Sequence, residues 1–341
     1  MPETPPVAPA TGFLPDAERA TALDHRMRQR LVASLAYVAR QAGEHLDLNA
    51  VRLERALQRI SATPQDPLVV GAYYELVVAI ELDELDRAQE FFDEILDRAT
   101  DAAPPFCVLP LPDPATSRDG RRFEQLFNSD ADAPFQIAPA PEALASAMAT
   151  RVHEALTLLD QVSPELAAET RALVRTIVLA ACPAPEDQEF VFDGASAFSL
   201  WGAILLNVES HESRPEMVSA LVHETAHNLL FGLSTDGRLV LNAPDERYDS
   251  PLRPDDRPMD GIYHATFVSG RMALALEALA NAEATALPAQ DREQARALAA
   301  ESRAAFARGD AVVHRHGRLS PLGEAILDSA RSWLKKVVDI S

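Results

Sequence analysis

The chain has 341 residues, a formal net charge of -21 and 47% hydrophobic residues, with only 13 glycines. This composition is typical of a globular, helix-rich protein. The excess of acidic residues argues against a nucleic-acid partner, because phosphates would be repelled. No apolar run is long enough to cross a membrane, and the first residues do not resemble a secretory signal. We therefore expect a cytoplasmic protein with no membrane partner.

The hydrophobic pattern predicts a leader followed by two blocks of helices. Residues 1–15 have the proline-rich composition of a disordered leader. A segment rich in proline and aspartate precedes residue 141, so we expect a helical subdomain with a connecting loop at 16–140 and a second domain at 141–341. Helices are predicted at residues 16–43, 48–60, 67–82, 85–99, 142–159, 164–181, 214–231, 261–286, 291–308 and 322–338.

Two further segments stand out from this helical series. Residues 75–97 carry many acidic side chains between apolar ones, which indicates a solvated helical face first and a partner-binding face second. Residues 189–193 and 199–208 are short and apolar, and they predict two strands joined by a turn at Gly194. These strands either complete the core or offer an edge to an extended peptide. The expected fold is mostly α with a small β element beside the helix at 214–231, a helix-dominated α+β class.

The helix at 214–231 contains the sequence H-E-T-A-H, which begins at residue 223. Residues four apart share one face of a helix, so His223 and His227 can bind one metal ion, with Glu224 beside them. We therefore interpret the domain at 141–341 as the metal-binding, catalytic domain. The two lone cysteines show no paired spacing and indicate neither a disulfide scaffold nor a thiolate metal site.

Local signals support a helix around this motif. Ser213 and Glu216 have the spacing of a capping box, and Pro215 falls in the first turn, where its missing N–H has no cost. Gly232 is a plausible C-terminal stop.

The third metal ligand decides the chemistry, and the sequence offers two candidates. Glu246 lies at the distance found in zinc peptidases that use a downstream glutamate, but its surroundings do not look helical. His264 lies near the start of an apolar helix and could project toward the metal, so we favour it. The extended metzincin pattern is excluded because Leu230 and Leu233 stand where glycine and histidine are required.

Arginines near these candidates suggest a site for a carboxylate. Arg253 and Arg257 lie between the motif helix and His264, and Arg271 lies two helical turns beyond His264. A guanidinium binds a carboxylate through two charge-assisted hydrogen bonds, as a dicarboxylate cosubstrate would require. Alternatively, these arginines offset the aspartates around them in an exposed loop.

The combination of motifs resembles a known family. The segments S-A-L-V-H-E-T-A-H-N-L-L at 219–230 and Y-D-S-P-L-R-P-D-D-R-P-M-D-G-I-Y-H-A at 248–265 are similar to the HExxH-motif proteins of ribosomal peptide natural-product pathways. That family is described as iron- and 2-oxoglutarate-dependent peptide β-hydroxylases. The resemblance covers roughly residues 190–275, and the second segment is more specific than H-E-x-x-H alone.

The resemblance implies a ligand set and a reaction. His223, His227 and His264 would bind Fe(II), and Arg253 and Arg257 would hold the cosubstrate 2-oxoglutarate. The partner would be a precursor peptide, hydroxylated at a side-chain β-carbon. Common non-haem iron oxygenases use two histidines and one carboxylate, so a set of three histidines leaves Glu224 as a base near the metal or as a fourth ligand.

Two other functions fit the same motif. In a zinc-dependent metallopeptidase, Glu224 would be the general base that activates water. A helical peptide-binding protein with a structural zinc would instead have a closed metal shell and no catalytic activity.

Overall fold

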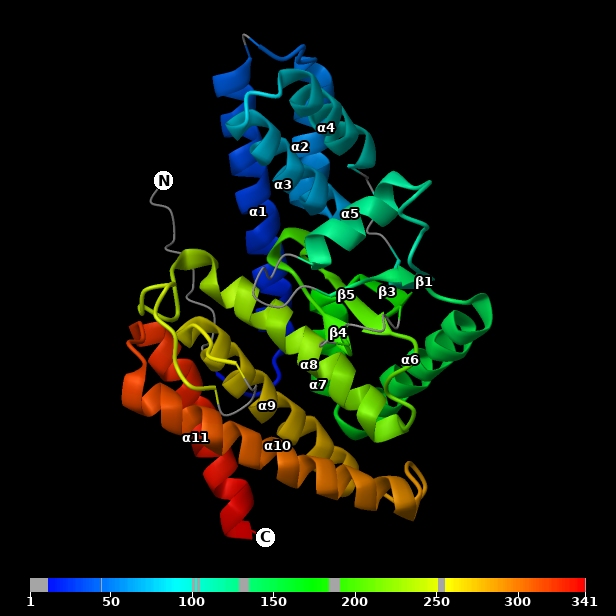
Figure 1. Ribbon diagram of the computed structural model, residues 1–341, viewed down its shortest axis with the longest axis vertical. Helices are drawn as coiled ribbons and strands as arrows, with labels where there is room; N and C mark the ends of the chain where they lie inside the picture. The colour runs from blue at the N-terminus through cyan, green and yellow to red at the C-terminus, as the bar shows by residue number, and fades with distance from the viewer. Residues whose placement is uncertain are drawn as a thin grey trace. The chain divides into compact units, whose positions relative to one another are not determined.

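The computed structural model describes residues 12–43, 45–99, 102, 105–128, 135–183, 191–250 and 255–340. It is dominated by helices and contains one small mixed sheet, which confirms the predicted fold class (Figure 1). The helices are α1 (Ala17–Ala42), α2 (Ala50–Ala62), α3 (Pro67–Glu81), α4 (Leu85–Arg98), α5 (Arg118–Phe127), α6 (Glu142–Val162), α7 (Pro164–Leu173), α8 (Arg214–Leu233), α9 (Met259–Ala280), α10 (Ala289–His316) and α11 (Pro321–Ile340).

Polar caps explain where several helices begin. Asn49 accepts a hydrogen bond from the backbone N–H of Arg52 at 3.0 Å, and α2 starts at Ala50, directly after this cap. Asp66 caps α3 in the same way at 2.9 Å, directly before a proline. Ser117 caps α5 at 3.2 Å. These side chains satisfy backbone donors that have no partner within the helix.

The sheet is built around β3, a buried strand with parallel neighbours on both sides. β1 pairs with β3 in parallel, in a register that starts with Cys107 opposite Thr176. β3 pairs with β5 in parallel, starting with Thr176 opposite Ala203. β2 and β4 add short antiparallel pairs to β3 and β5, respectively. The strands are β1 (Cys107–Pro110), β2 (Ala138–Pro139), β3 (Thr176–Ala181), β4 (Gly194–Ala195) and β5 (Ala203–Asn207).

The predicted strands are partly correct. β5 lies within the predicted strand at 199–208, whose first residues instead form a short 3-10 turn. Of the strand predicted at 189–193, residues 189 and 190 lie outside the described residues, and the pairing partner of β5 begins only at Gly194. The helix predicted at 164–181 is wrong in its second half, because β3 occupies that part of the chain.

The chain forms two compact units that alternate along the sequence. One unit contains the described residues of 12–23, 153–170 and 212–340, and the other those of 24–152 and 171–211. This division differs from the predicted one, which placed a single boundary near residue 140. The chain passes from one unit to the other within α6 and again within α7. Because the helical periodicity continues through both points, the sequence does not indicate that these helices contribute to two different units.

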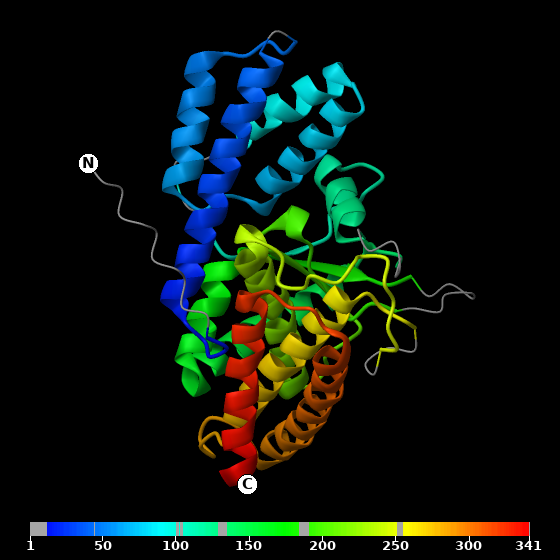
Figure 2. The same ribbon diagram turned by 90° about the vertical axis from the view of Figure 1, so that its left-hand side faces the viewer.

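In the second unit, α1 to α4 lie side by side (Figure 2), and side chains from all four form one apolar core. The core includes the completely buried Leu35 of α1, Ile60 of α2, Leu76 of α3 and Ile95 of α4. A second apolar cluster in the same unit joins α5 to the sheet through Phe123, Val178 and Leu205, among others.

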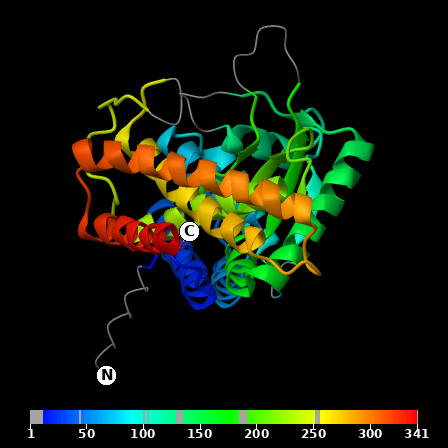
Figure 3. The same cartoon turned by 90° about the horizontal axis from the view of Figure 1, so that it is seen from below.

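The first unit is built from long helices. Figure 3 shows α10 lying along α9, with α11 beside them. The ring of Phe13 is completely buried here, with ring-centroid distances of 5.9 Å to Phe267 and 5.6 Å to Trp333. Its backbone N–H donates to the hydroxyl of Ser329 at 2.8 Å. Residues 12–15 were expected to belong to a disordered leader, but the structure describes them, and the ring of Phe13 packs into the core of the unit.

A buried ion cluster anchors the same N-terminal segment. The carboxylate of Glu169 is 0% exposed and pairs with Arg19 at 2.8 Å and with Arg271 of α9. Arg271 also donates to the carbonyl of Phe13 at 2.6 Å, and Arg19 donates to the carbonyl of Leu14 at 2.8 Å. A buried charge is tolerated when it is paired and hydrogen-bonded, so this cluster depends on all of its members.

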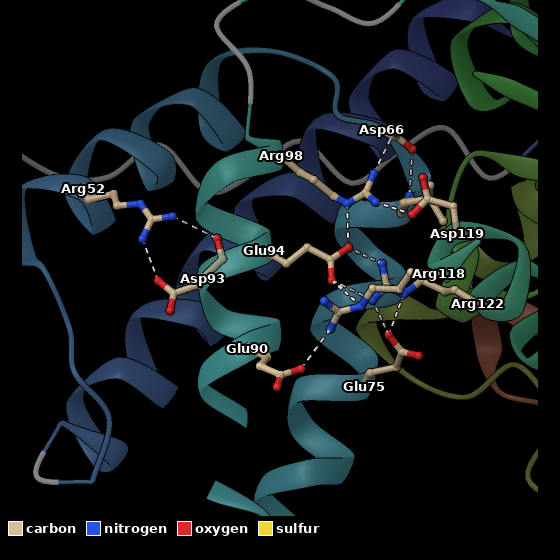
Figure 4. A network of polar contacts seen from close by, with 11 residues as sticks. Arg52, Asp66, Glu75, Glu90, Asp93, Glu94, Arg98, Arg118, Asp119 and Arg122 are labelled. Atoms are coloured by element: carbon tan, nitrogen blue, oxygen red, sulfur yellow. Dashed lines mark hydrogen bonds and ion pairs between the residues drawn. The ribbon is translucent and has the colours of Figure 1, made fainter. Parts of the chain in front are cut away.

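A second ion network lies in the other unit, where Arg122 joins α5 to α3 and α4 (Figure 4). The Arg122 side chain is 1% exposed and contacts Glu75 at 2.5 Å and Glu94 at 2.6 Å. Burial raises the pKa of Glu94, but the hydrogen bonds and charges of Arg122 and Arg98 outweigh this effect and bring its pKa down to about 2.

We predict that replacing Phe13 with alanine lowers the free energy of unfolding by about 3 kcal/mol, because it leaves a cavity in the core. Urea denaturation of the purified protein measures this change. Leu14→Ala is the matched control. Leu14 is 52% exposed, so its loss should change stability by less than about 0.5 kcal/mol. Equal effects of the two substitutions would contradict the assignment of Phe13 to the core.

We predict that Glu94→Gln lowers stability near neutral pH by about 3 kcal/mol, because Arg122 loses a buried partner. The pKa of Glu94 is lowered from 4.5 to about 2 in the folded protein, so its stabilising effect is present above pH 4.5 and is lost as the pH falls toward 2. Urea unfolding across this pH range should therefore show wild type and variant converging in acid. Glu90→Gln is the control, since Glu90 is 68% exposed and should show almost no effect at any pH.

Candidate metal centre

Helix α8 carries the H-E-x-x-H motif and begins as the sequence predicts. The hydroxyl of Ser213 accepts from the backbone N–H of Glu216 at 3.3 Å, and the Glu216 carboxylate accepts from the N–H of Ser213 at 3.0 Å. These two bonds form a capping box, with a proline in the first turn. The predicted stop at Gly232 is wrong, because α8 continues to Leu233 and Ser234 is its C-cap.

Most of the α8 surface is buried, and the motif lies on its accessible stripe. From the middle of the helix onward, His223, His227 and Phe231 are the partly exposed positions, spaced four residues apart. The side chain of His223 is 37% exposed. Two imidazoles therefore reach solvent from a helix whose other faces are fixed by packing. A metal bound there would be accessible to a substrate.

Helix α9 packs against α8 and brings further side chains to the motif. His264 lies in its second turn, and its ring is stacked on the ring of His227 with centroids 5.5 Å apart. Met272 lies about two turns further along α9 and contacts His223. The ring of Phe231 lies 5.8 Å from that of His264 and forms an apolar neighbour of the histidines.

The spacing of the two motif histidines fits chelation of one ion. Nε2 of His223 lies 3.2 Å from Nε2 of His227. Nitrogen ligands bind zinc or iron at about 2.1 Å, so two ligands of one ion are separated by roughly 3 Å. The pair therefore presents two nitrogen donors at the distance that a shared metal requires.

The third histidine is adjacent to this pair but does not complete it. Nδ1 of His264 lies 3.2 Å from Nδ1 of His227, whereas His223 approaches the other nitrogen of the same ring. Within the described ranges, no group of three or more histidine, cysteine, aspartate or glutamate side chains converges on one point. Binding of one ion by all three histidines therefore requires at least one imidazole to change its orientation.

Met272 contacts the first imidazole of the motif. Its sulfur lies 3.3 Å from Nδ1 of His223, where it can accept a hydrogen bond from a protonated Nδ1. In that tautomer the lone pair is on Nε2, the nitrogen that faces His227. A partner on the far nitrogen is the usual way in which proteins fix a metal-binding histidine.

The environment of His264 favours the neutral imidazole. Burial lowers the pKa of His264, and the carboxylate of Asp260 one turn earlier opposes this effect in part. A neutral imidazole has the lone pair that a metal ion requires. The electrostatic environment of His264 is therefore compatible with its expected role as a ligand.

Glu224 lies beside the histidine pair, as H-E-x-x-H predicts. Its side chain is 6% exposed, and Oε1 lies 3.9 Å from Nε2 of His223. At this distance the carboxylate does not replace an imidazole ligand, but it can interact with a molecule bound next to the metal. Such a position suits a base near the metal in either of the enzymatic hypotheses.

Glu246, the alternative third ligand, is engaged elsewhere. Its carboxylate accepts hydrogen bonds from Tyr248 at 2.5 Å and from Asn242 at 3.3 Å, and it pairs with Arg318 at 2.9 Å. The hydroxyl of Tyr248 is the main cause of the lowered pKa of Glu246. The structure thus brings His264 next to the motif and holds Glu246 in a separate network.

The arginines are placed less favourably for binding a cosubstrate than the histidines are for binding a metal. Nε of Arg257 lies 2.6 Å from the carboxylate of Asp255, and its side chain is 11% exposed. This pairing matches the alternative in which arginines offset nearby aspartates, and a cosubstrate would have to displace Asp255. Arg253 lies outside the described residues. The expectation that Arg271 could hold a cosubstrate is wrong, since it is buried and paired with Glu169.

Sequence reasoning missed two residues of this site. Phe231 continues the spacing of four set by the histidines, so a helical wheel of α8 could have identified it. Met272 gives no comparable signal, because its contact with His223 depends on how α8 and α9 pack.

The chain matches no protein-family model and no curated protein significantly. Among the helices that the structure describes, none combines the length and apolar character needed to cross a membrane.

We predict that Zn²⁺ binds to this site and raises the melting temperature, because a ligand of the folded state stabilises it by mass action. His223→Ala and His227→Ala should abolish both binding and stabilisation, as measured by calorimetric titration and thermal unfolding. His314→Ala is the matched control, since His314 is an exposed histidine on α10. Unchanged binding in the His227→Ala variant would contradict the site.

Proposed function

We propose that this protein is an Fe(II)- and 2-oxoglutarate-dependent oxygenase that hydroxylates a side-chain β-carbon of a ribosomally made peptide. The observation that carries the proposal is the contact between His264 and His227, made while Glu246 is engaged with Tyr248 and Arg318. A set of three histidines is the ligand set that the resemblance to the HExxH-motif peptide β-hydroxylases implies.

The site residues divide into three roles in this proposal. His223, His227 and His264 would hold the metal, with Met272 fixing the first imidazole. When bound, Fe(II) and 2-oxoglutarate would supply the oxidation: O₂ inserts one oxygen atom into a peptide C–H bond while 2-oxoglutarate is converted to succinate and CO₂. Phe231, whose ring lies beside those of His227 and His264, would limit the access of water on that side of the metal.

In this proposal the arginines would bind the cosubstrate. Arg257 already binds a carboxylate, that of Asp255, so its guanidinium suits the distal carboxylate of 2-oxoglutarate after exchange. Arg253 is the second candidate. The precursor peptide would reach the metal from the accessible stripe of α8, where His223 is partly exposed.

One observation favours a second function, a zinc-dependent metallopeptidase. The buried carboxylate of Glu224 lies 3.9 Å from Nε2 of His223, where it could activate a water molecule for attack on a peptide bond. The two functions differ in their need for Glu224, His264 and 2-oxoglutarate. They are therefore separable by variants.

We predict that protein reconstituted anaerobically with Fe(II) develops a charge-transfer absorption band on addition of 2-oxoglutarate, and releases succinate when O₂ is admitted. His264→Ala should lose both signals, because the third nitrogen ligand is gone. Glu246→Gln is the matched control and should retain both, since Glu246 belongs to a different network.

Two results would overturn the proposal. One is tightly bound zinc together with peptide cleavage that disappears in the Glu224→Gln variant, which would establish the peptidase. The other is bound iron that shows no absorption change with 2-oxoglutarate.

A further inference from the structure

Helix α3 presents a row of exposed apolar side chains, which we call the α3 stripe. It consists of Tyr74 and Val78 of α3 and of Leu82, the C-cap residue, which are 50%, 38% and 61% exposed and follow one another at intervals of four residues. A further leucine, Leu85, is 37% exposed at the start of α4. Residues at this spacing lie on one helical face, so the three side chains form a continuous apolar surface.

The fold itself does not require this surface. The opposite side of α3 supplies the core of the unit through Val69, Ala72, Leu76 and Ala79, all of which are buried. Single exposed apolar residues are common on proteins, but a row of large ones is unusual and marks interaction sites. The α3 stripe is therefore a candidate docking surface.

Acidic residues are frequent in the sequence next to the stripe. Between residues 74 and 90 the chain has one basic residue, Arg87, and that residue pairs with Glu84. Glu81, Asp83 and Asp86 are exposed at the end of α3 and the start of α4. The acidic residues in this stretch are Glu81, Asp83, Glu84, Asp86 and Glu90, together with Glu75, whose charge is already paired with Arg122.

The acidic residue at position 83 is locally unfavourable for the fold. Asp83 adopts a left-handed conformation, with φ of 58°, in the turn that ends α3. The N–H of Glu84 donates to the carbonyl of Ala79 at 2.8 Å, and that of Asp83 donates to Ile80 at 3.1 Å. This turn normally uses glycine at the left-handed position. The charge itself is close to neutral for the fold, because Asp83 lies at the C-terminal end of α3 but also directly before Glu84, the N-cap of α4, where a negative charge is favourable.

We propose that the α3 stripe binds a basic amphipathic helix of a partner polypeptide. The apolar side of such a helix would cover Val78 and Leu82, and its lysines or arginines would lie beside Glu81 and Asp83. Compensation by these cations would account for an acidic residue where glycine is more stable. The same negative charge disfavours a second copy of this surface, an anionic lipid surface or a nucleic acid.

The inference is independent of the metal centre, and its test uses designed peptides. The probe is a fluorescently labelled peptide of about 18 residues, five helical turns, with leucine on one face and lysine on the other. A leucine–glutamate peptide of the same pattern tests the charge. A lysine peptide of equal charge with serine in place of leucine tests the apolar face. Fluorescence anisotropy with the full chain should show binding of the leucine–lysine peptide alone, weakening as salt is added.

Variants locate the binding site. Val78→Gln combined with Leu82→Gln keeps the charge of the protein and should weaken binding at least about tenfold. Val51→Gln is the matched control, because Val51 is 71% exposed on α2, and it should leave binding unchanged. Asp83→Gly should raise the melting temperature and weaken the binding of the leucine–lysine peptide severalfold. Glu301→Gln on α10 should have neither effect.

Three results would overturn the inference. Equal affinity of the leucine–lysine peptide for wild type and for the Val78→Gln, Leu82→Gln protein would show that only the overall charge attracts it. Equal binding of the serine-containing lysine peptide would lead to the same conclusion. Self-association of the wild type that the double variant abolishes, measured by sedimentation without peptide, would assign the stripe to a second copy. Circular dichroism confirms that each variant is folded.

Discussion

The packing of α8 on α9 is the constraint on which the candidate metal centre depends. Helical geometry places His223 and His227 on one face of α8, but only the second helix adds His264 beside one imidazole and Met272 beside the other. A slide of α9 by one helical turn, about 5.4 Å, would break both contacts together. The register of two helices therefore determines whether the motif has a third histidine within reach.

Interactions away from the histidines help to position α9. Arg271 lies two turns from His264 on the same helix and is held by Glu169 and by the carbonyl of Phe13. Burial lowers the pKa of Arg271, and the charge of Glu169 opposes this effect. Arg271 therefore stabilises the fold and is not positioned to bind a cosubstrate, and the N-terminal segment helps to hold α9 in place.

The features predicted correctly are those that depend on local sequence. The start of α8 follows from Ser213 and Glu216, and the pairing of His223 with His227 follows from helical spacing. Strand β3 could not be separated from the preceding helix, since its identity depends on pairing with β1 and β5, far away in the chain. The sequence favoured His264 over Glu246 but could not show which of them lies beside the motif, because that also depends on how distant segments pack.

Diffraction at the iron absorption edge tests most directly which residues bind the metal. Crystals grown anaerobically with Fe(II) should show an anomalous peak bonded to nitrogens of His223, His227 and His264, with at least one imidazole turned from its present orientation. A peak bonded to the first two histidines and to the carboxylate of Glu246, or one located away from α8, would contradict the account.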